Sequence, residues 1–151
     1  MNEFFKAAQL DDLEILEMIE RECFHDPWNE AMLGSELNMP HSKYLILTDG
    51  ENVFGYLSYL HILDELHIMN VAVLPDYQGR GYGKMMVKKI IDDAKALDAN
   101  AITLEVRESN IRAQKLYENL GFVCAGTRPH YYMDKENALI YWLELGGGID
   151  N

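Results

Sequence analysis

Three glycines, Gly79, Gly81 and Gly83, lie between an apolar run and a segment with the hydrophobic spacing of a helix. Glycine tolerates positive φ and lets a ligand approach the backbone closely, and the free N–H groups at a helix N-terminus attract phosphate oxygens. Arg80, between the first two glycines, adds positive charge to the same segment. The pattern therefore predicts a loop that binds a diphosphate cofactor.

Two common nucleotide motifs do not fit this loop. A P-loop needs Gly, four residues and then Gly-Lys-Ser/Thr, but here Gly83 and Lys84 follow Gly79 one residue too soon, and Met85 replaces the hydroxyl residue. A dinucleotide fingerprint needs Gly-x-Gly-x-x-Gly, whereas the spacing here is Gly-x-Gly-x-Gly, and Pro75–Tyr77 separates it from the preceding strand. Both motifs are excluded.

The loop does match another cofactor signature. With Gln78, Arg80, Gly81 and Gly83 in place, strand, loop and helix together resemble the acetyl-CoA signature of the GCN5-related N-acetyltransferases, Gln/Arg-x-x-Gly-x-Gly/Ala. The resemblance implies that acetyl-CoA is the co-substrate. A glycine-rich turn without a ligand is the structural alternative.

The expected strand 101–107 carries a carboxylate in its interior. Alternate residues of a strand point to opposite faces. One face would carry Ile102, Leu104 and Val106, and the other Thr103, Glu105 and Arg107. Because an unpaired buried carboxylate costs several kcal/mol, Glu105 should either pair with a cation such as Arg107 or line a water-filled cleft.

Acetyl transfer to an amine would use such a carboxylate. An amine attacks a thioester only as the free base, and an α-amine with a pKa of about 8 is mostly protonated at neutral pH. Glu105 is therefore our candidate general base, acting directly or through water. Tyr117, on the helix that begins at Asn110, is the candidate acid that protonates the departing thiolate. It could equally be a core residue, because it shares a stripe with Ala113 and Leu116.

A narrower resemblance covers both candidates. The segments Leu104–Asn110 and Leu116–Phe122 look like the pattern of the RimI-type ribosomal-protein-alanine N-acetyltransferases. In that family the glutamate that matches Glu105 is the proton acceptor, and the tyrosine that matches Tyr117 is the proton donor. The family also has a Glu-x-x-Cys/Ala-Phe…Pro-Trp element near its N-terminus and a Tyr-Tyr pair after its sixth strand. The first element is matched by Arg21-Glu22-Cys23-Phe24 with Pro27-Trp28, and the second by Tyr131 and Tyr132.

The same resemblance implies the binding residues. The backbone of Val71, Ala72 and Val73 would pair with the pantetheine arm, and the Val73 N–H would polarise the thioester carbonyl. The pyrophosphate would be held by Gly79, Arg80, Gly81, Tyr82, Gly83 and Lys84. Asn110 would bond the pantetheine, although it also suits an ordinary helix cap. Phe24, Trp28, Tyr131 and Tyr132 would frame the entrance for a peptide N-terminus, or serve as hydrophobic cover.

Composition limits the class of protein. The 151 residues, 48% of them hydrophobic, suit one globular domain, which we place at 1–145 with a flexible tail at 146–151. No apolar run is long enough for a membrane span and the N-terminal segment is acidic, so we expect a cytoplasmic protein without signal peptide or anchor. The formal net charge of −12 argues against nucleic acid and favours a cationic substrate, although acidic surfaces also keep proteins soluble.

Hydrophobic periodicity defines the order of elements as β-α-α-β-β-β-α-β-α-β-β. The expected strands cover 3–8, 43–48, 53–61, 66–74, 101–107, 122–127 and 138–145, and the helices lie near 13–23, 29–37, 83–97 and 110–120. This order predicts an α/β (α+β) fold with a mixed sheet and helices on both faces. It also resembles the acetyltransferase fold over nearly the whole chain.

Three functions remain open from the sequence. The leading one is acetylation of a protein α-amine, most directly the N-terminal alanine of a small-subunit ribosomal protein, by a monomer or weak dimer. The second is the same chemistry on a small amine or antibiotic. The third is a non-catalytic CoA-binding module, against which Glu105 and Tyr117 both count. Neither Cys23 nor Cys124 has metal-ligand spacing, so we expect no metal.

Overall fold

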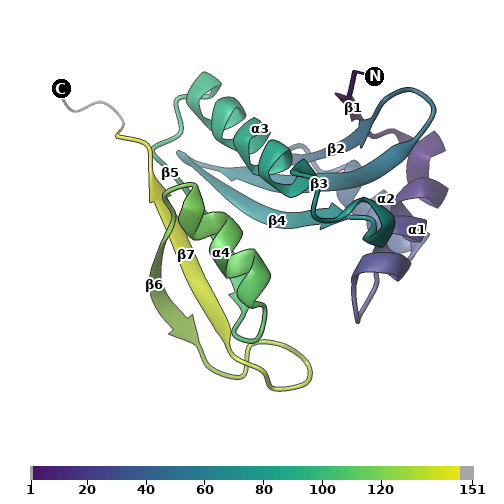
Figure 1. The fold of residues 1–151 in the computed structure, drawn as a ribbon. Coiled ribbons are helices and arrows are strands. Elements are labelled where there is room, and N and C mark those ends of the chain that lie inside the picture. Colours follow the sequence, from purple (N-terminus) through teal and green to yellow (C-terminus); the bar gives the residue numbers. More distant parts are fainter. Residues whose placement is uncertain (1, 147–151) are drawn as a thin grey trace. The chain divides into compact units, whose positions relative to one another are not determined.

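The computed structural model describes residues 2–146, so nearly all of the tail predicted for 146–151 lies outside the described residues. Within the described residues, four α-helices and seven strands follow the predicted order, besides two short 3-10 helices (Figure 1). The elements are β1 (Phe4–Ala7), α1 (Leu13–Cys23), α2 (Glu30–Leu37), β2 (Ser42–Thr48), β3 (Val53–Ile62), β4 (Glu65–Val73), α3 (Tyr82–Ala96), β5 (Ala101–Arg107), α4 (Ile111–Asn119), β6 (Val123–Arg128) and β7 (Ala138–Glu144).

The strands form one mixed sheet in the order β1-β2-β3-β4-β5-β7-β6. Strand β5 runs parallel to β4, and the pairs β1–β2, β2–β3, β5–β7 and β6–β7 are antiparallel. The mixed α/β fold predicted from the hydrophobic pattern is therefore confirmed. Among the described residues, no helix is long and apolar enough to cross a membrane.

The chain divides into two compact units. The first contains the residues up to His61 together with Met69–Lys88, and the second contains Ile62–Ile68 and the chain from Lys89 onward. Strand β4 and helix α3 therefore each contribute residues to both units. Each unit is described by itself below.

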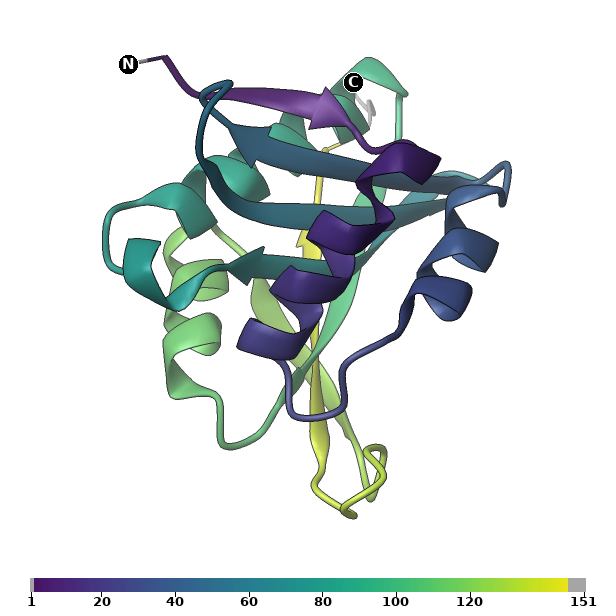
Figure 2. The same cartoon turned by 90° about the vertical axis from the view of Figure 1, so that its right-hand side faces the viewer.

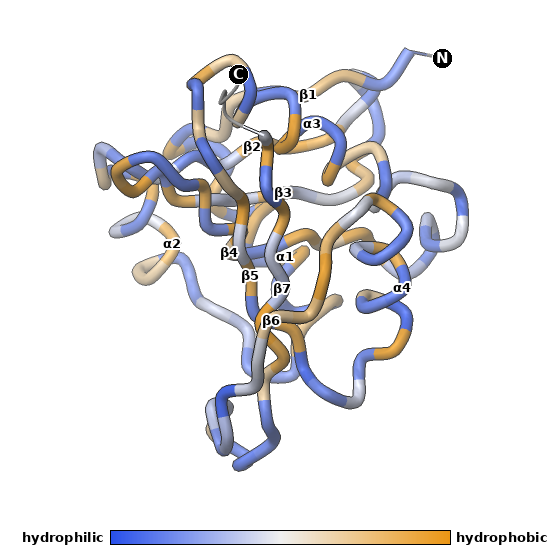
Figure 3. The backbone as a smooth tube through the Cα atoms, turned by 90° about the vertical axis from the view of Figure 1, so that its left-hand side faces the viewer, coloured by the Kyte–Doolittle hydropathy of each residue, from blue (hydrophilic) through white to orange (hydrophobic). Residues whose placement is uncertain are grey.

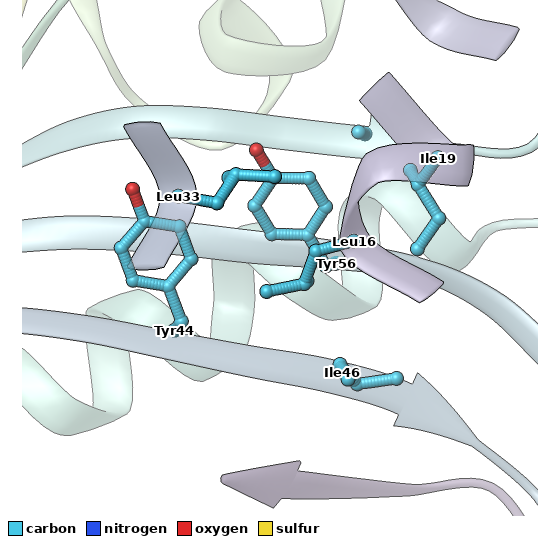
Figure 4. Close-up of a cluster of buried hydrophobic side chains, with 7 residues drawn as sticks. Leu16, Ile19, Leu33, Tyr44, Ile46 and Tyr56 are labelled. Atoms are coloured by element: carbon cyan, nitrogen blue, oxygen red, sulfur yellow. The ribbon is translucent and has the colours of Figure 1, made fainter. Parts of the chain in front are cut away.

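In the first unit, α1 and α2 cover one face of β2 and β3 (Figure 2). Tyr44 and Tyr56 stack with ring centroids 5.8 Å apart beneath the two helices (Figure 4). The buried cluster consists of Leu16, Ile19, Leu33, Tyr44, Ile46, Tyr56 and Ala72. Because these apolar side chains are almost fully removed from water, they supply the main hydrophobic stabilisation of this face.

The other face of the same strands is covered by the start of α3. Gly55 lies next to Tyr56 in β3 and so faces the other way. A Cβ at Gly55 would meet the Ala72 carbonyl oxygen at 1.9 Å and the Met86 Cε at 2.9 Å. Only glycine fits this close approach. Because helices cover both faces of the strands, the residues of β2 from Tyr44 to Thr48 are all buried, with no alternation between buried and exposed positions.

In the second unit, α4 packs on β7, where the ring of Tyr117 lies against that of Tyr141. Ile102, Leu104 and Val106 are buried on the face towards the helix. Tyr141, which pairs with Leu104 in the register of β5 and β7, is 1% exposed on that face. The opposite face carries the polar residues of β5, so the period of two predicted from the sequence separates a core face from a polar face.

Candidate active site

Glu105 lies on the polar face of β5. The parallel pairing places His67 beside Thr103, on the same face as Glu105. His67 Nε2 is 2.8 Å from Glu105 Oε1, and Arg128 Nε is 3.5 Å from Oε2. The Glu105 side chain is 10% exposed. Each carboxylate oxygen thus has a neighbouring nitrogen, which offsets the cost of removing the charge from water.

These neighbours set the protonation state of the carboxylate. The hydrogen bond with His67 holds the pKa of Glu105 below its ordinary value, although burial acts in the opposite direction, and the Arg128 charge lowers it further. Glu105 is therefore ionised at neutral pH. The sequence suggested Arg107 as one possible cation for Glu105, but Arg107 Nη1 lies 2.9 Å from carboxylate oxygens of Asp134 and Glu136.

Tyr117 is buried on α4. Its ring lies 5.4 Å from that of Phe122 and 6.5 Å from that of Tyr141, between ring centroids. Burial raises the pKa of Tyr117, so the hydroxyl keeps its proton at neutral pH. Among the described residues, no hydrogen bond ties this hydroxyl to the backbone. The side chain is a buried residue of the core, and the role of proton donor stays a prediction.

The two candidates lie on opposite faces of the sheet. Tyr141 is directly paired with Leu104, and directly paired residues of antiparallel strands share a face. Tyr117 packs on Tyr141, so it belongs to the Leu104 face, whereas Glu105 points to the other side. A base on one face and an acid on the other could serve the two sides of a carbonyl carbon, where the amine enters and the thiolate leaves.

The glycine loop has the backbone conformation predicted for it. Gly79 and Gly81 have φ values of 80° and 90°. A Cβ at Gly81 would meet no protein atom within 4 Å, so the space in front of this backbone is open. Arg80 and Lys84 are exposed, and the Arg80 guanidinium lies 5.4 Å from the ring centroid of Tyr77. Gly83 lies in the first turn of α3, where the N–H groups of a helix have no partner within the helix.

Tyr82 has a structural role in this loop. Its ring stacks on Phe54 at 4.6 Å between centroids, and its hydroxyl is 3.4 Å from a carboxylate oxygen of Glu3. The side chain is thereby held against the sheet. The contact of Tyr82 with the pyrophosphate stays a prediction.

Val71, Ala72 and Val73 form the end of β4, where the sequence placed the pantetheine arm. The Val73 carbonyl accepts a hydrogen bond from Gln78 Nε2 at 2.9 Å and another from Cys23 Sγ at 3.4 Å. Burial, with nearby acidic side chains, raises the pKa of Cys23 to about 11, so this thiol is a donor. Gln78 thus ties the glycine loop to the end of β4.

Asn110 is the N-cap of α4. Its Oδ1 accepts a hydrogen bond from Ala113 N at 3.1 Å. This contact satisfies one of the free N–H groups at the helix start. The capping role predicted from the sequence is confirmed, and the pantetheine contact stays a prediction.

Phe24 and Trp28 lie in the α1–α2 loop and are half-buried against the core of the first unit. Glu20, which the sequence analysis missed, holds this loop. It is 3% exposed, accepts a hydrogen bond from Trp28 N at 2.8 Å and accepts another from the Tyr56 hydroxyl. The available signal was the Glu-x-x-Cys spacing of the N-terminal family element, which Glu20 and Cys23 have.

Tyr131 and Tyr132 lie in the β6–β7 loop, residues 129–137, of the second unit. Their rings meet edge to face at 5.1 Å between centroids. Tyr131 is 49% exposed, whereas Tyr132 is half-buried. The second unit therefore holds this aromatic pair together with Glu105, Tyr117 and Asn110, and the first unit holds the glycine loop, Val71–Val73 and the Phe24–Trp28 loop. In the described part of the chain, no group of three or more His, Cys, Asp or Glu residues could hold a metal ion.

Comparison with known proteins identifies the class. The chain matches the model of the acetyltransferase (GNAT) family over residues 13–122. This match spans more than half of the chain, which therefore belongs to the GNAT family of acetyltransferases. Members of this family use acetyl-CoA, which is the co-substrate predicted from the glycine loop.

Individual relatives narrow the class. The [ribosomal protein bS18]-alanine N-acetyltransferase of Haemophilus influenzae is 37% identical over 135 residues, covering 85% of this chain and 90% of that protein. The Escherichia coli K12 enzyme of the same name is 32% identical over 142 residues, covering 92% and 95%. The crystal structure of the E. coli ribosomal-protein-S18-alanine N-acetyltransferase matches with a TM-score of 0.90 and 31% identity, covering 99% of this chain and 98% of that one. The resemblance to RimI-type N-acetyltransferases is thus confirmed.

The ionised Glu105 makes stability depend on pH. Its folded pKa lies below the unfolded value of about 4.3, so its stabilising contribution is fully present above that value and is lost as pH falls through the folded pKa. We expect the free energy of unfolding of the wild type to exceed that of Glu105→Gln at pH 7, and this difference to shrink below pH ~4.3. Urea unfolding from pH 7 to 3 measures it, with Glu108→Gln, an exposed neighbour, as the charge control. A difference that stays constant over this range would contradict the assignment.

Proposed function

We propose that the chain transfers the acetyl group of acetyl-CoA to the α-amine of a protein N-terminus, with the N-terminal alanine of ribosomal protein bS18 as acceptor. The relatives named for this reaction cover at least 85% of the chain and at least 90% of their own length. Their match takes in residues of both compact units, which supports a single catalytic domain over 1–145. Cytoplasmic location and a monomer or weak dimer, acting without nucleic acid or membrane, complete the proposal.

The observation that carries the proposal is the ionised, nearly buried Glu105 between His67 and Arg128. A carboxylate has about four lone-pair sites, so these two contacts leave room for a water molecule or for the ammonium group of the acceptor. An anion at this place attracts the protonated amine and takes up its proton, directly or through water. Because the pKa of Glu105 is low, its carboxylate would pass the proton on to solvent and would not stay protonated.

Tyr117 supplies the proton for the departing thiolate. Its hydroxyl is protonated at neutral pH, as a proton donor to the thiolate must be. Its place on the face opposite Glu105 supports direct transfer, because the proton acceptor and the proton donor then serve different sides of the reacting carbon. No covalent enzyme intermediate is needed.

The cofactor would lie along the glycine loop. The open space at Gly81 and the exposed cations Arg80 and Lys84 support pyrophosphate binding by residues 79–84. Val71–Val73 and Asn110 would contact the pantetheine arm. The exposed ring of Tyr131, with Tyr132, Phe24 and Trp28, would contact the acceptor peptide.

A panel of acceptors tests the function. Purified protein is incubated with acetyl-CoA and peptides that begin with the bS18 alanine, the same peptides blocked at the α-amine, lysine peptides and polyamines. We expect acetylated product, detected by mass, only from peptides with a free α-amine. Preferred acetylation of polyamines would favour the small-amine alternative, and no product from any acceptor would refute the proposed reaction.

The glycine loop can be tested by substitution. Gly81→Val should abolish the rise in melting temperature that acetyl-CoA produces, because the side chain would enter the space proposed for the pyrophosphate. Gly50→Val is a matched control, since Gly50 also has a positive φ, of 98°, and open space around its Cβ, but lies in the β2–β3 turn. Both variants carry similar backbone strain, so only Gly81→Val should lose the ligand-induced shift in thermal unfolding. Equal shifts in the two variants would remove the loop from the cofactor site.

Tyr117 can be tested by removing only its hydroxyl. Tyr117→Phe keeps the ring contacts with Phe122 and Tyr141, so the fold and the acceptor KM should hold while kcat falls by about 10²-fold. The loss should be smaller with a thioester whose leaving thiol is more acidic, because that thiolate needs less protonation. Steady-state kinetics with both thioesters decide the point. Equal losses of kcat with both thioesters would mean that Tyr117 is a core residue and not the proton donor.

A further inference from the structure

Arg107, at the end of β5, connects this strand to the β6–β7 loop. It lies two residues beyond Glu105 and therefore on the same face. Its Nη1 is 2.9 Å from Asp134 Oδ2 and 2.9 Å from Glu136 Oε1. The Arg107 side chain is 26% exposed and that of Glu136 is 22% exposed, so the pair is partly shielded from solvent. One guanidinium thus holds two carboxylates of a single loop.

The same guanidinium also holds an aromatic ring. The Arg107 Cζ lies 4.1 Å from the ring centroid of Tyr132, within the range of a favourable cation–π contact. Burial raises the pKa of Tyr132 to about 12, against the opposing effect of the Arg107 charge. Tyr131 packs edge-on against Tyr132 and so is supported through it. Arg107 therefore contacts Tyr132 directly and supports Tyr131 through it, and these are the two tyrosines proposed for the acceptor site.

The β6–β7 loop cannot hold this shape by propensity alone. The loop is mostly hydrophilic (Figure 3), with the exposed Met133 as an apolar exception. His130 and Lys135 have positive φ values of 55° and 74°, which non-glycine residues adopt only when surrounding contacts impose them. Glu136 supplies one such contact, because its Oε2 also accepts a hydrogen bond from Ser109 N at 2.7 Å. The loop is thus tied to the end of β5 through the carboxylate that Arg107 binds.

A second arginine links the start of the loop to the proposed base. Arg128 lies 3.5 Å from Glu105 and 5.7 Å from the ring centroid of Tyr131. Each ring of the tyrosine pair therefore has an arginine near it, Arg128 at Tyr131 and Arg107 at Tyr132. A shift of the loop would change the distance between its exposed ring and the base.

We propose that Arg107 is a positioning residue that holds the β6–β7 loop as one wall of the acceptor site. The inference rests on the proposed function, since it takes Tyr131 and Tyr132 as acceptor contacts. An isolated surface ion pair contributes little to stability. Arg107 differs from such a pair because one partly buried guanidinium binds two carboxylates and a ring, which a lysine cannot reproduce.

The experiment combines proteolysis with kinetics. Lys135 is an exposed residue of the loop and offers a trypsin site. In Arg107→Met we expect faster cleavage after Lys135, read by mass, and an acceptor KM raised roughly tenfold or more, because displaced contacts no longer orient the peptide. The KM for acetyl-CoA should stay unchanged, and kcat should change by less than about threefold. Arg107→Lys should fall between wild type and Arg107→Met in both measurements.

Lys115→Met, which removes an exposed cation from α4, is the matched control and should behave as wild type. Cleavage of Arg107→Met at the control rate would overturn the proposal, as would faster cleavage with an unchanged acceptor KM. Should Arg107→Met not fold, Arg107→Lys carries the same comparison. Failure of the proposed function would be seen separately, as a wild type that acetylates no α-amine, and it leaves the cleavage comparison intact.

Discussion

The arrangement of the second unit depends on one constraint, which is that a nearly buried carboxylate must keep partners to stay charged. Glu105 meets it with His67 from β4 and Arg128 from β6, so three strands contribute to one small polar cluster. Because β5 alternates strictly, the same strand buries Leu104 in the core on its other face. The chemistry proposed for Glu105 and the packing of Tyr117 therefore follow from a single strand that separates a polar from an apolar side.

The first unit also contains a nearly buried carboxylate whose oxygens have hydrogen-bond partners. Glu20 is almost fully buried, and its oxygens accept hydrogen bonds from the Tyr56 hydroxyl and the Trp28 backbone. Leaving either oxygen unsatisfied would cost the desolvation free energy of a charged group. The carboxylate therefore orders the α1–α2 loop, much as Arg107 orders the β6–β7 loop. In both cases a charged side chain on a regular element determines the shape of a loop that has little preference of its own.

Much of the fold was predictable because its signals are local. The apolar stripe of α3, the alternation in β5 and the Asn110 cap are each set by residues a few positions apart, and the structure has them at nearly the predicted bounds. The positive φ of Gly79 and Gly81 follows from the glycines themselves. The partners of Glu105 were not predictable in this way. His67 is 38 residues from Glu105 in the sequence, and only the pairing of β4 with β5 brings them together.

By itself, the sequence determined the order of the elements, the glycine loop and the family, because periodicity, backbone freedom and motif spacing are properties of neighbouring residues. Only the tertiary structure decided which cations meet which carboxylates. Arg107 was a reasonable partner for Glu105 from the alternation of β5, yet its guanidinium binds Asp134 and Glu136 while Arg128 approaches Glu105. The physical reason is that ion pairs depend on strand register and loop path, which bring distant residues within a few ångströms and leave no trace in local sequence.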